Sequence, residues 1–266
     1  MSSFDAVNTE TSDSTAYIAY GTGSVYVLPG TDDITLFSNL MVNDGSGLPD
    51  ESVLGALTLE DAQFNEAVYV PGSTFTNTGF SGLFGLGYPS LAVNNQAPPF
   101  YQLWKNGQVR GEIGVFLGRE ESEIGGLMTF GGYEADLFIG TLQWHPVVTQ
   151  AYWEIDFKGL TFGSDKVFPL TSGSTAAIDT GTSLIATNAA QSNLLNAWIM
   201  AGGQEPTADQ IKAATDAGSS NDGITIVDCK LVKTLPDLTF HFAGGDYPLP
   251  VHFLFQKPSW TEIDEH

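Results

Sequence analysis

Hydrophobic and polar residues alternate in many short stretches of this chain, which is the pattern of half-buried β-strands. The alternation is clearest over residues 15–20 and 24–28, on either side of the sequence Gly21-Thr22-Gly23. Two alternating segments joined by a short glycine-containing turn predict a β-hairpin. Further strands and turns are predicted over residues 32–36, 67–70, 80–91, 114–118, 126–132, 140–144, 152–157, 224–229 and 235–242.

Three segments have helical patterns instead. Residues 98–104 begin with two prolines and are followed by Asn106-Gly107, which predicts a short helix with a sharp end. Residues 188–200 carry apolar side chains at helical spacing and end at Gly202-Gly203. Residues 206–217 predict another helix, and residues 43–52, rich in Gly, Asp and Pro, predict an exposed loop.

Composition favours a folded protein of the all-β class. Of the 266 residues, 42% are hydrophobic and 15% are charged, which excludes a disordered chain. Thirty glycines and thirteen prolines are typical of short strands joined by tight turns. The length suits one large domain or two smaller ones.

The charge and the rare residue types exclude several classes of partner. A formal charge of −22 repels nucleic acid and anionic lipid, so we expect neither as a partner. No apolar segment is long enough to span a membrane, and the first residues do not form a secretory signal. The single cysteine, Cys229, excludes an internal disulfide. The four histidines are too far apart in the sequence for a metal motif, so no metal or cofactor is expected; they are His145, His241, His252 and His266.

The sequence from Ala176 to Thr187 is the strongest candidate for chemistry. An apolar run leads to Asp179, the residues Thr180-Gly181-Thr182-Ser183 follow, and Leu184-Ile185 is apolar again. This order predicts a carboxylate at the end of a buried strand, in a tight turn whose hydroxyl groups can hydrogen-bond to it. The alternative is an ordinary helix N-cap, because Asp, Thr and Ser all cap helices and the sequence from Asn188 onward is helical.

Two of these motifs resemble the pepsin-like aspartic protease family. Asp179-Thr180-Gly181-Thr182-Ser183 resembles the second active-site loop of that family, and Tyr20-Gly21-Thr22-Gly23-Ser24 resembles its flap hairpin. Residues 80–91, 126–132, 152–153 and 235–240 are similar to further family segments in the same order. The resemblance implies a bilobal β-barrel fold, incomplete in both lobes, with a partial N-terminal lobe over residues 1–140 and a partial C-terminal lobe over residues 141–266.

The resemblance also implies roles for individual residues. Asp179 would be a catalytic acid, supported by Thr180, Gly181, Thr182 and Ser183 of its loop. The flap residues Tyr20, Gly21 and Thr22 would cover a bound peptide, and Tyr152 would line a peptide subsite. The expected substrate is a peptide or protein, without a cofactor. The family suggests a secreted location or an acidic vacuolar or lysosomal compartment, and the sequence itself does not decide between them.

Aspartic proteolysis needs two carboxylates, one ionised and one protonated. The family's first Asp-Thr-Gly-Ser precedes the flap, yet Asp5 and Asp13 before Tyr20 lack a following Thr-Gly and do not lie in apolar strands. We therefore expect a chain truncated at both ends that is inactive alone. Alternatives are a non-enzymatic peptide-binding protein and a dimer that contributes two Asp179 residues, which the first-lobe strands would obstruct. Exposed strand edges would also favour self-association.

Overall fold

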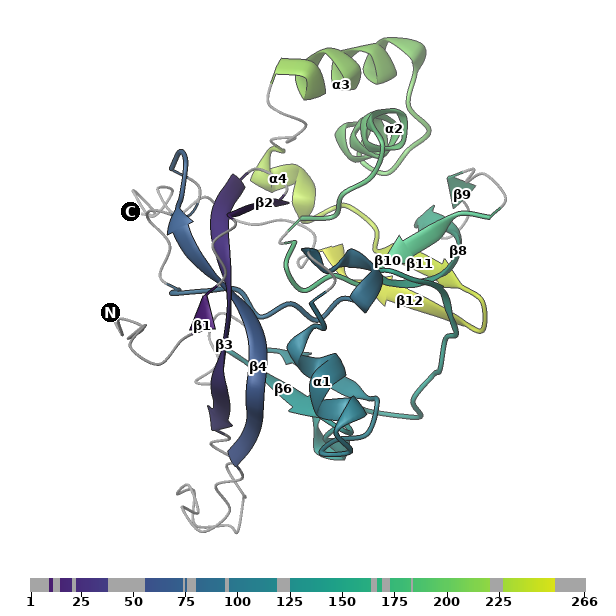
Figure 1. Cartoon of the computed structure of the whole chain (residues 1–266). Helices are drawn as coiled ribbons and strands as arrows, with labels where there is room; N and C mark the ends of the chain where they lie inside the picture. Colours follow the sequence, from purple (N-terminus) through teal and green to yellow (C-terminus); the bar gives the residue numbers. More distant parts are fainter. Residues whose placement is uncertain are drawn as a thin grey trace, which may run out of the picture. The chain divides into compact units, whose positions relative to one another are not determined.

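Two compact units, Met1–Gly140 and Thr141–His266, each carry an antiparallel sheet (Figure 1). The assignment of these units as the two lobes of the expected fold stays a prediction. The structure, a computed structural model, describes residues 10–11, 15–20, 23–37, 56–73, 75, 80–93, 96–118, 125–163, 167–168, 173–182, 184–220 and 227–251. The predicted loop over residues 43–52 lies outside these residues.

The first unit is built on the long strand β3 (Gly23–Phe37). Strand β3 pairs with β2 (Ala16–Tyr20) and β1 (Glu10–Thr11) along one edge and with β4 (Ala56–Tyr69) along the other. Tyr20 stands opposite Gly23, so the connection between β2 and β3 holds two residues. The predicted hairpin is thereby confirmed, and its turn residues, Gly21 and Thr22, lie outside the described residues.

The strands predicted over 24–28 and 32–36 are confirmed, but they are parts of the single strand β3, so the break predicted between them was wrong. Pro29-Gly30 suggested a break, but the pairing explains why proline fits here. Strand β2 pairs with β3 up to Val27, and β1 pairs with it only from Gly30 onward. Pro29 lies in the gap between these two partners, where the hydrogen-bond donor that proline lacks is not needed by the described strands.

A β-bulge bends the β3–β4 ladder. The register passes from Asp32 opposite Ala62 to Ile34 opposite Leu59, so one residue of β3 stands opposite two of β4. Asp61, one of those two, has a φ of 51°. Its backbone N–H donates to Asp33 Oδ1 at 3.0 Å. Short polar residues tolerate this left-handed conformation better than other non-glycine residues, which explains the choice of Asp.

Helix α1 (Pro99–Lys105) packs against β4 and closes a core of three buried side chains, Leu59, Ala62 and Leu103. The predicted short helix is confirmed, and Gly107, with a φ of 72°, ends it. Partly buried apolar residues complete this core: Ile34, Leu36, Leu57 and Val109.

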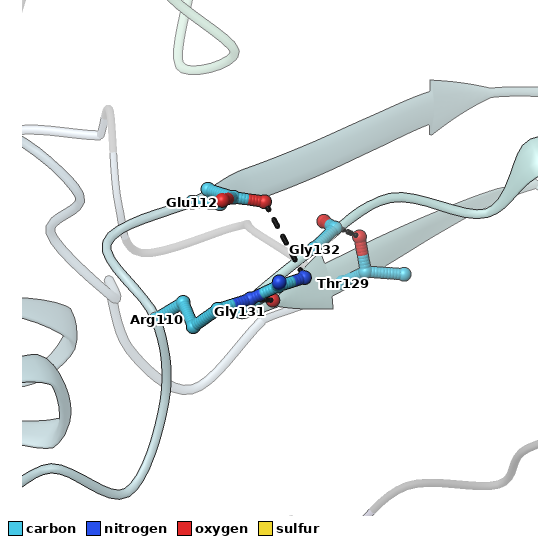
Figure 2. Close-up of polar contacts among 5 residues, drawn as sticks. All are labelled: Arg110, Glu112, Thr129, Gly131 and Gly132. Carbon is cyan, nitrogen blue, oxygen red and sulfur yellow. Dashed lines mark hydrogen bonds and ion pairs between the residues drawn. The ribbon is translucent and has the colours of Figure 1, made fainter.

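Strands β5 (Ile113–Leu117) and β6 (Gly126–Phe130), which confirm the strands predicted in these segments, pair as a separate hairpin. Figure 2 shows Arg110 reaching across its open end: Nε donates to the carbonyl of Gly131 at 3.0 Å, and the guanidinium lies 3.7 Å from Glu112 Oε2. In β6, Thr129 Oγ1 donates to the carbonyl of Gly132, which lies just beyond the strand. A Cβ at Gly114 would lie 2.4 Å from that hydroxyl, so only glycine fits there.

The glycine-rich segment over residues 80–91 contains no strand, contrary to the prediction of a core strand. Its regular structure is one 3₁₀ turn, Pro89–Leu91, and the side chains of Phe80 and Leu83 are more than half exposed. A Cβ at Gly82 or Gly85 would meet nothing within 4 Å. The core strand was predicted because dense glycines allow another backbone to pack closely. Glycine permits such packing but does not cause it, and no other described segment packs at Gly82 or Gly85.

The second unit is organised around β8 (Trp153–Phe162). Four shorter strands pair with it: β7 (Val147–Gln150), β9 (Val167–Phe168), β10 (Thr175–Ala177) and β11 (Leu238–Phe242), and β12 (Gly245–Leu249) pairs with β11. The predicted strand 140–144 is absent; a 3₁₀ turn, Ala135–Leu137, precedes that segment, and β7 follows it. The predicted strand 235–242 begins at Leu238 because Pro236 lies at its start.

Helices α2 (Ala189–Met200) and α3 (Ala208–Ser220) pack on each other and are confirmed predictions. Trp198 and Ile199 of α2 join Phe162, Leu235 and Leu238 in the core of this unit. Cys229 begins the short helix α4 (Cys229–Val232) and was wrongly predicted in a strand; residues 224–226 lie outside the described residues. Asp228 caps α4 through a bond from the N–H of Lys230 to its carboxylate.

None of the helices in the described part of the chain has the length and apolar character needed to cross a membrane.

Replacement of Asp61 tests the strained bulge. We expect Asp61→Val to lower the free energy of unfolding by about 1 to 2 kcal/mol, because a β-branched residue is poorly accommodated at a positive φ. Asp61→Gly should leave stability within about 0.5 kcal/mol or raise it, since glycine adopts this conformation freely. Urea unfolding followed by circular dichroism measures both changes.

Glu60→Val is the matched control, because Glu60 is the exposed neighbour of Asp61 in the same bulge. An equal loss of stability in Glu60→Val and Asp61→Val would show that backbone conformation at Asp61 is not the cause.

Candidate functional site

Strand β10 delivers Asp179 to the edge of the second unit's sheet. Its residues Thr175 to Ala177 stand opposite Asp156 to Glu154 of β8. The pairing continues one residue beyond the strand, because the N–H of Ile178 donates to the carbonyl of Trp153 at 3.1 Å. The chain then leaves the sheet at Asp179, so β8 fixes where this carboxylate lies.

Both oxygens of the Asp179 carboxylate accept hydrogen bonds from its own turn. The backbone N–H of Gly181 donates to Oδ1 at 2.8 Å, and the hydroxyl of Thr182 donates to Oδ2 at 2.6 Å. The predicted hydrogen bonding of a loop hydroxyl to the carboxylate is thus confirmed for Thr182. A Cβ at Gly181 would lie 3.1 Å from Oδ1, so a larger residue would crowd the carboxylate. Thr180 lies exposed within the turn, and Ser183 is outside the described residues.

Asp179 is not the N-cap of the helix that follows. Helix α2 begins at Ala189, and its cap is Asn188, whose Oδ1 accepts a hydrogen bond from the N–H of Gln191 at 3.0 Å. The helix-cap interpretation of the Asp-Thr-Gly motif is therefore excluded. The hydrogen bonds of Asp179 serve the turn and orient the carboxylate.

The predicted burial of this loop was wrong. Ile178 is 55% exposed, Leu184 is 56% exposed and Ile185 is 49% exposed. Strand β10 has three residues, and β8 is its strand partner in the sheet of the second unit. An apolar sequence shows that a segment tolerates burial, but its burial depends on other segments that cover it.

Tyr152 lies at the same end of the β8–β10 pair as Asp179, although 26 residues separate them in the sequence. Tyr152 occupies the turn between β7 and β8, directly before Trp153. The last contact of the β8–β10 pair joins Ile178 to Trp153, so Asp179 and Tyr152 are the next residue on each side. Tyr152 is half exposed. The structure therefore brings two of the predicted site residues to the same end of one sheet.

Tyr20 lies in the first unit, at the end of β2. Its ring meets the ring of Phe75 edge to face, with 5.7 Å between centroids and 83° between planes. Burial raises the pKa of the Tyr20 phenol above its ordinary value of 10.0. Phe75 was not among the predicted site residues, because nothing in the local sequence connects it with a tyrosine 55 positions earlier.

The described residues contain no group of three or more His, Cys, Asp or Glu side chains that could hold a metal ion. The chemistry available at Asp179 is that of a carboxylate with its two donors, Gly181 and Thr182.

A second polar cluster lies on three strands of the second unit. Thr161 Oγ1 is 2.8 Å from His241 Nε2, and His241 Nδ1 is 2.7 Å from Asp246 Oδ1. These residues belong to β8, β11 and β12 and lie on the sheet face opposite the core residues Phe162 and Leu238. Sequence analysis found no role for His241. The contacts show it as a link across the strands.

Comparison with known proteins places these features in a family. The sequence model of the eukaryotic aspartyl protease family matches residues 2–264. A vacuolar aspartic protease of Candida albicans is 36% identical over 203 residues, which are 75% of this chain and 44% of that protein. Cathepsin E of Rattus norvegicus is 36% identical over 234 residues, which are 87% of this chain and 50% of that protein. The chain spans about half the length of the curated relatives it matches.

The raised pKa of Tyr20 predicts a pH dependence at the alkaline end. The neutral phenol is favoured in the folded state, so its stabilising contribution is complete below pH 10.0 and is lost as the pH rises through the higher folded value. We expect the free energy of unfolding to fall less steeply with alkaline pH in Tyr20→Phe than in the unaltered chain. Urea unfolding at a series of pH values measures this slope.

Phe75→Ala should return the pKa of Tyr20 toward the ordinary value, because it removes the ring packed against the phenol. Phe138→Ala, which removes a ring packed on Tyr133 instead, is the control. Phenolate absorbance in an alkaline titration measures the change. An equal effect of the two alanine variants would contradict a local cause.

Proposed function

Since this chain belongs to the eukaryotic aspartyl protease family, we propose that Asp179 is one of the two carboxylates of a peptide-hydrolysing centre. The observation that supports the proposal is the hydrogen bonding of both Asp179 oxygens by Gly181 and Thr182 within the Asp-Thr-Gly-Thr turn. This turn holds the carboxylate in one orientation at the end of β10. Catalysis by proton transfer requires such orientation.

The chemistry assigns complementary tasks to two acids. An ionised carboxylate takes a proton from a water molecule, the water attacks the peptide carbonyl, and a protonated carboxyl group donates to the developing oxyanion. An ionised carboxylate is a pure acceptor of hydrogen bonds, and Asp179 accepts from two donors. We therefore assign Asp179 the task of activating the water, and a second carboxyl group the task of donating the proton.

The aromatic residues near the chain's motifs would hold the peptide. Tyr152 lies at the same end of the β8–β10 pair as Asp179 and is half exposed, which suits a side chain that lines a subsite. Tyr20, at the end of the β2–β3 hairpin, would shield the reacting groups from bulk water, with Gly21 and Thr22 contacting the peptide backbone. The substrate class in this proposal is a peptide or protein.

The chain contains a single Asp-Thr-Gly sequence, Asp179-Thr180-Gly181. One carboxylate cannot both take and give the proton in the same step. We propose that the 266 residues by themselves do not hydrolyse peptides and that hydrolysis needs a second acid from another Asp-Thr-Gly loop. Where catalytic groups act as a unit, loss of one member lowers the rate by about ten-thousand to a million-fold.

A second candidate function is peptide binding without hydrolysis. It is favoured by the positions of Tyr152 and Tyr20, whose proposed contacts with a peptide do not depend on a second carboxylate. The name of the Candida albicans relative supports a vacuolar site of action in either case. An acidic compartment also suits a chain with a formal charge of −22, because protonation of carboxylates there reduces repulsion within the chain.

The hydrolytic role of Asp179 can be tested by complementation. The chain alone should not cleave a denatured protein at about pH 4, where one acid of such a pair is ionised and the other protonated. Addition of a fragment of a relative that carries the family's other Asp-Thr-Gly loop should give cleavage that a pepstatin-type inhibitor blocks. Asp179→Asn should abolish that cleavage, whereas Asp209→Asn, an exposed aspartate of α3, should not. Product peptides measured by mass spectrometry report each result.

Cleavage by the chain alone that disappears in Asp179→Asn would refute the need for a second acid. Complemented cleavage that survives Asp179→Asn would refute the role of Asp179.

Tyr152→Ala tests the binding role without any catalysis. We expect the chain to bind a pepstatin-type peptide and the variant to bind it about five- to tenfold more weakly, since an aromatic contact of this kind contributes about 1 kcal/mol. Calorimetric titration measures both affinities, and Tyr133→Ala, another half-exposed tyrosine, is the control. Equal affinities for the chain and Tyr152→Ala would exclude Tyr152 from the peptide site.

A further inference from the structure

Three tyrosines form a row across the sheet of the first unit. Tyr17 of β2 stands directly opposite Tyr26 of β3, and Tyr26 stands directly opposite Tyr69 of β4. The ring centroids of Tyr17 and Tyr26 are 5.2 Å apart, and those of Tyr26 and Tyr69 are 5.8 Å apart. The rings are inclined by 61° and 41°, so both faces and edges are presented along the row. We call these three residues the tyrosine row.

The tyrosine row is accessible. Tyr17 is 55% exposed, Tyr26 is 41% exposed and Tyr69 is 60% exposed. The neighbouring pair on the same face toward the turn, Ala19 and Ser24, is small and leaves the rings uncovered. The opposite face of the sheet is the packed one, because Val27, next to Tyr26, is 2% exposed. Tyr20 of the proposed active site also belongs to that opposite face, since side chains alternate along β2.

Large exposed aromatic side chains grouped on one face are typical of interaction surfaces, where they supply contact area at little cost in conformational entropy. A cross-strand ladder of aromatic rings also stabilises the sheet that carries it. Stabilisation of the sheet requires that the rings touch one another. It does not explain why they are exposed or why the nearby charge is negative.

The part of the sequence that contains β1 to β4 carries charge of one sign. The first Lys or Arg in the sequence is Lys105 and the first His is His145, so no basic residue occurs in the part of the chain that contains β1 to β4. Eleven acidic residues occur in the same part: Asp5, Glu10, Asp13, Asp32, Asp33, Asp44, Asp50, Glu51, Glu60, Asp61 and Glu66.

Glu66 lies next to the row. It stands opposite Leu28 on the ladder between β3 and β4, and Leu28 follows Tyr26 by two positions, so these residues share the face of the rings. Exposed aromatic rings beside a carboxylate, in a stretch of sequence without basic residues, attract cations. Arginine suits such a surface best, because its planar guanidinium stacks on aromatic rings and is weakly hydrated.

We propose that the tyrosine row is a docking surface for a basic polypeptide segment, whose arginine side chains stack on Tyr17, Tyr26 and Tyr69 while nearby carboxylates balance their charge. The tyrosine row belongs to the first unit and Asp179 to the second, and binding at the row does not depend on the proposed hydrolytic function. It lies on the β2–β3 hairpin that carries Tyr20, so an occupant would contact the back of the predicted flap.

The test uses the whole chain and three labelled ten-residue peptides in which serine alternates with arginine, lysine or citrulline. We expect the arginine peptide to bind most tightly in fluorescence anisotropy, the lysine peptide more weakly because it lacks a planar group, and the citrulline peptide least because it is uncharged. The double variant Tyr17→Thr with Tyr69→Thr should lose about tenfold in affinity for the arginine peptide, since each exposed cation–π contact contributes about 0.5 to 1 kcal/mol.

Tyr133→Thr is the matched control and should bind the arginine peptide as the unaltered chain does. Threonine is used in the double variant because it has a high strand propensity. A second measurement, protection from nitration, uses the unaltered chain and needs no substitution. The arginine peptide should protect Tyr17, Tyr26 and Tyr69, and not Tyr133, from nitration mapped by mass spectrometry. Equal binding by the double variant and the unaltered chain, or protection without preference for the row, would overturn the proposal and leave only diffuse attraction by charge.

Discussion

The pairing of β10 with β8 is the interaction on which the candidate site depends. It is short, with three paired residues and two flanking backbone hydrogen bonds, from Ile178 to Trp153 and from Phe157 to Ser174. It nevertheless determines where the chain leaves the sheet, because a strand register fixes every neighbour along the pair. Asp179 therefore lies at the same end of this pair as Tyr152.

The turn after β10 is held by contacts among its own residues. The carboxylate of Asp179 is held by the N–H of Gly181 and the hydroxyl of Thr182, two and three residues further along the chain. These contacts need no distant partner, which explains why the motif is recognisable in the sequence. Burial of the surrounding apolar side chains, Ile178, Leu184 and Ile185, needs distant segments to cover them, and these side chains are exposed.

The two faces of the β2–β3 hairpin have different character. One face carries Tyr20, packed on Phe75, and the other carries the tyrosine row with Glu66 next to it. The alternation of side chains along a strand makes this division possible in five residues of β2. The β2–β3 hairpin thus carries both Tyr20, proposed to cover the peptide, and the tyrosine row. A ligand that binds the row more tightly in one position of the hairpin would favour that position.

The sequence by itself determined the strand-rich class, the hairpin, helices α1, α2 and α3, and the membership of the aspartyl protease family, which confirms the predicted pepsin-like fold class. These features depend on periodicity and on residues that are neighbours in the chain. The tertiary structure decided what the pattern could not: the passage of β3 through Pro29, the exposure of residues 80–85, the helical start at Cys229, and the contacts of Tyr20 with Phe75 and of Thr161 with His241. Such contacts join residues far apart in sequence, and local propensity carries no information about which distant segment will cover or pair with a given residue.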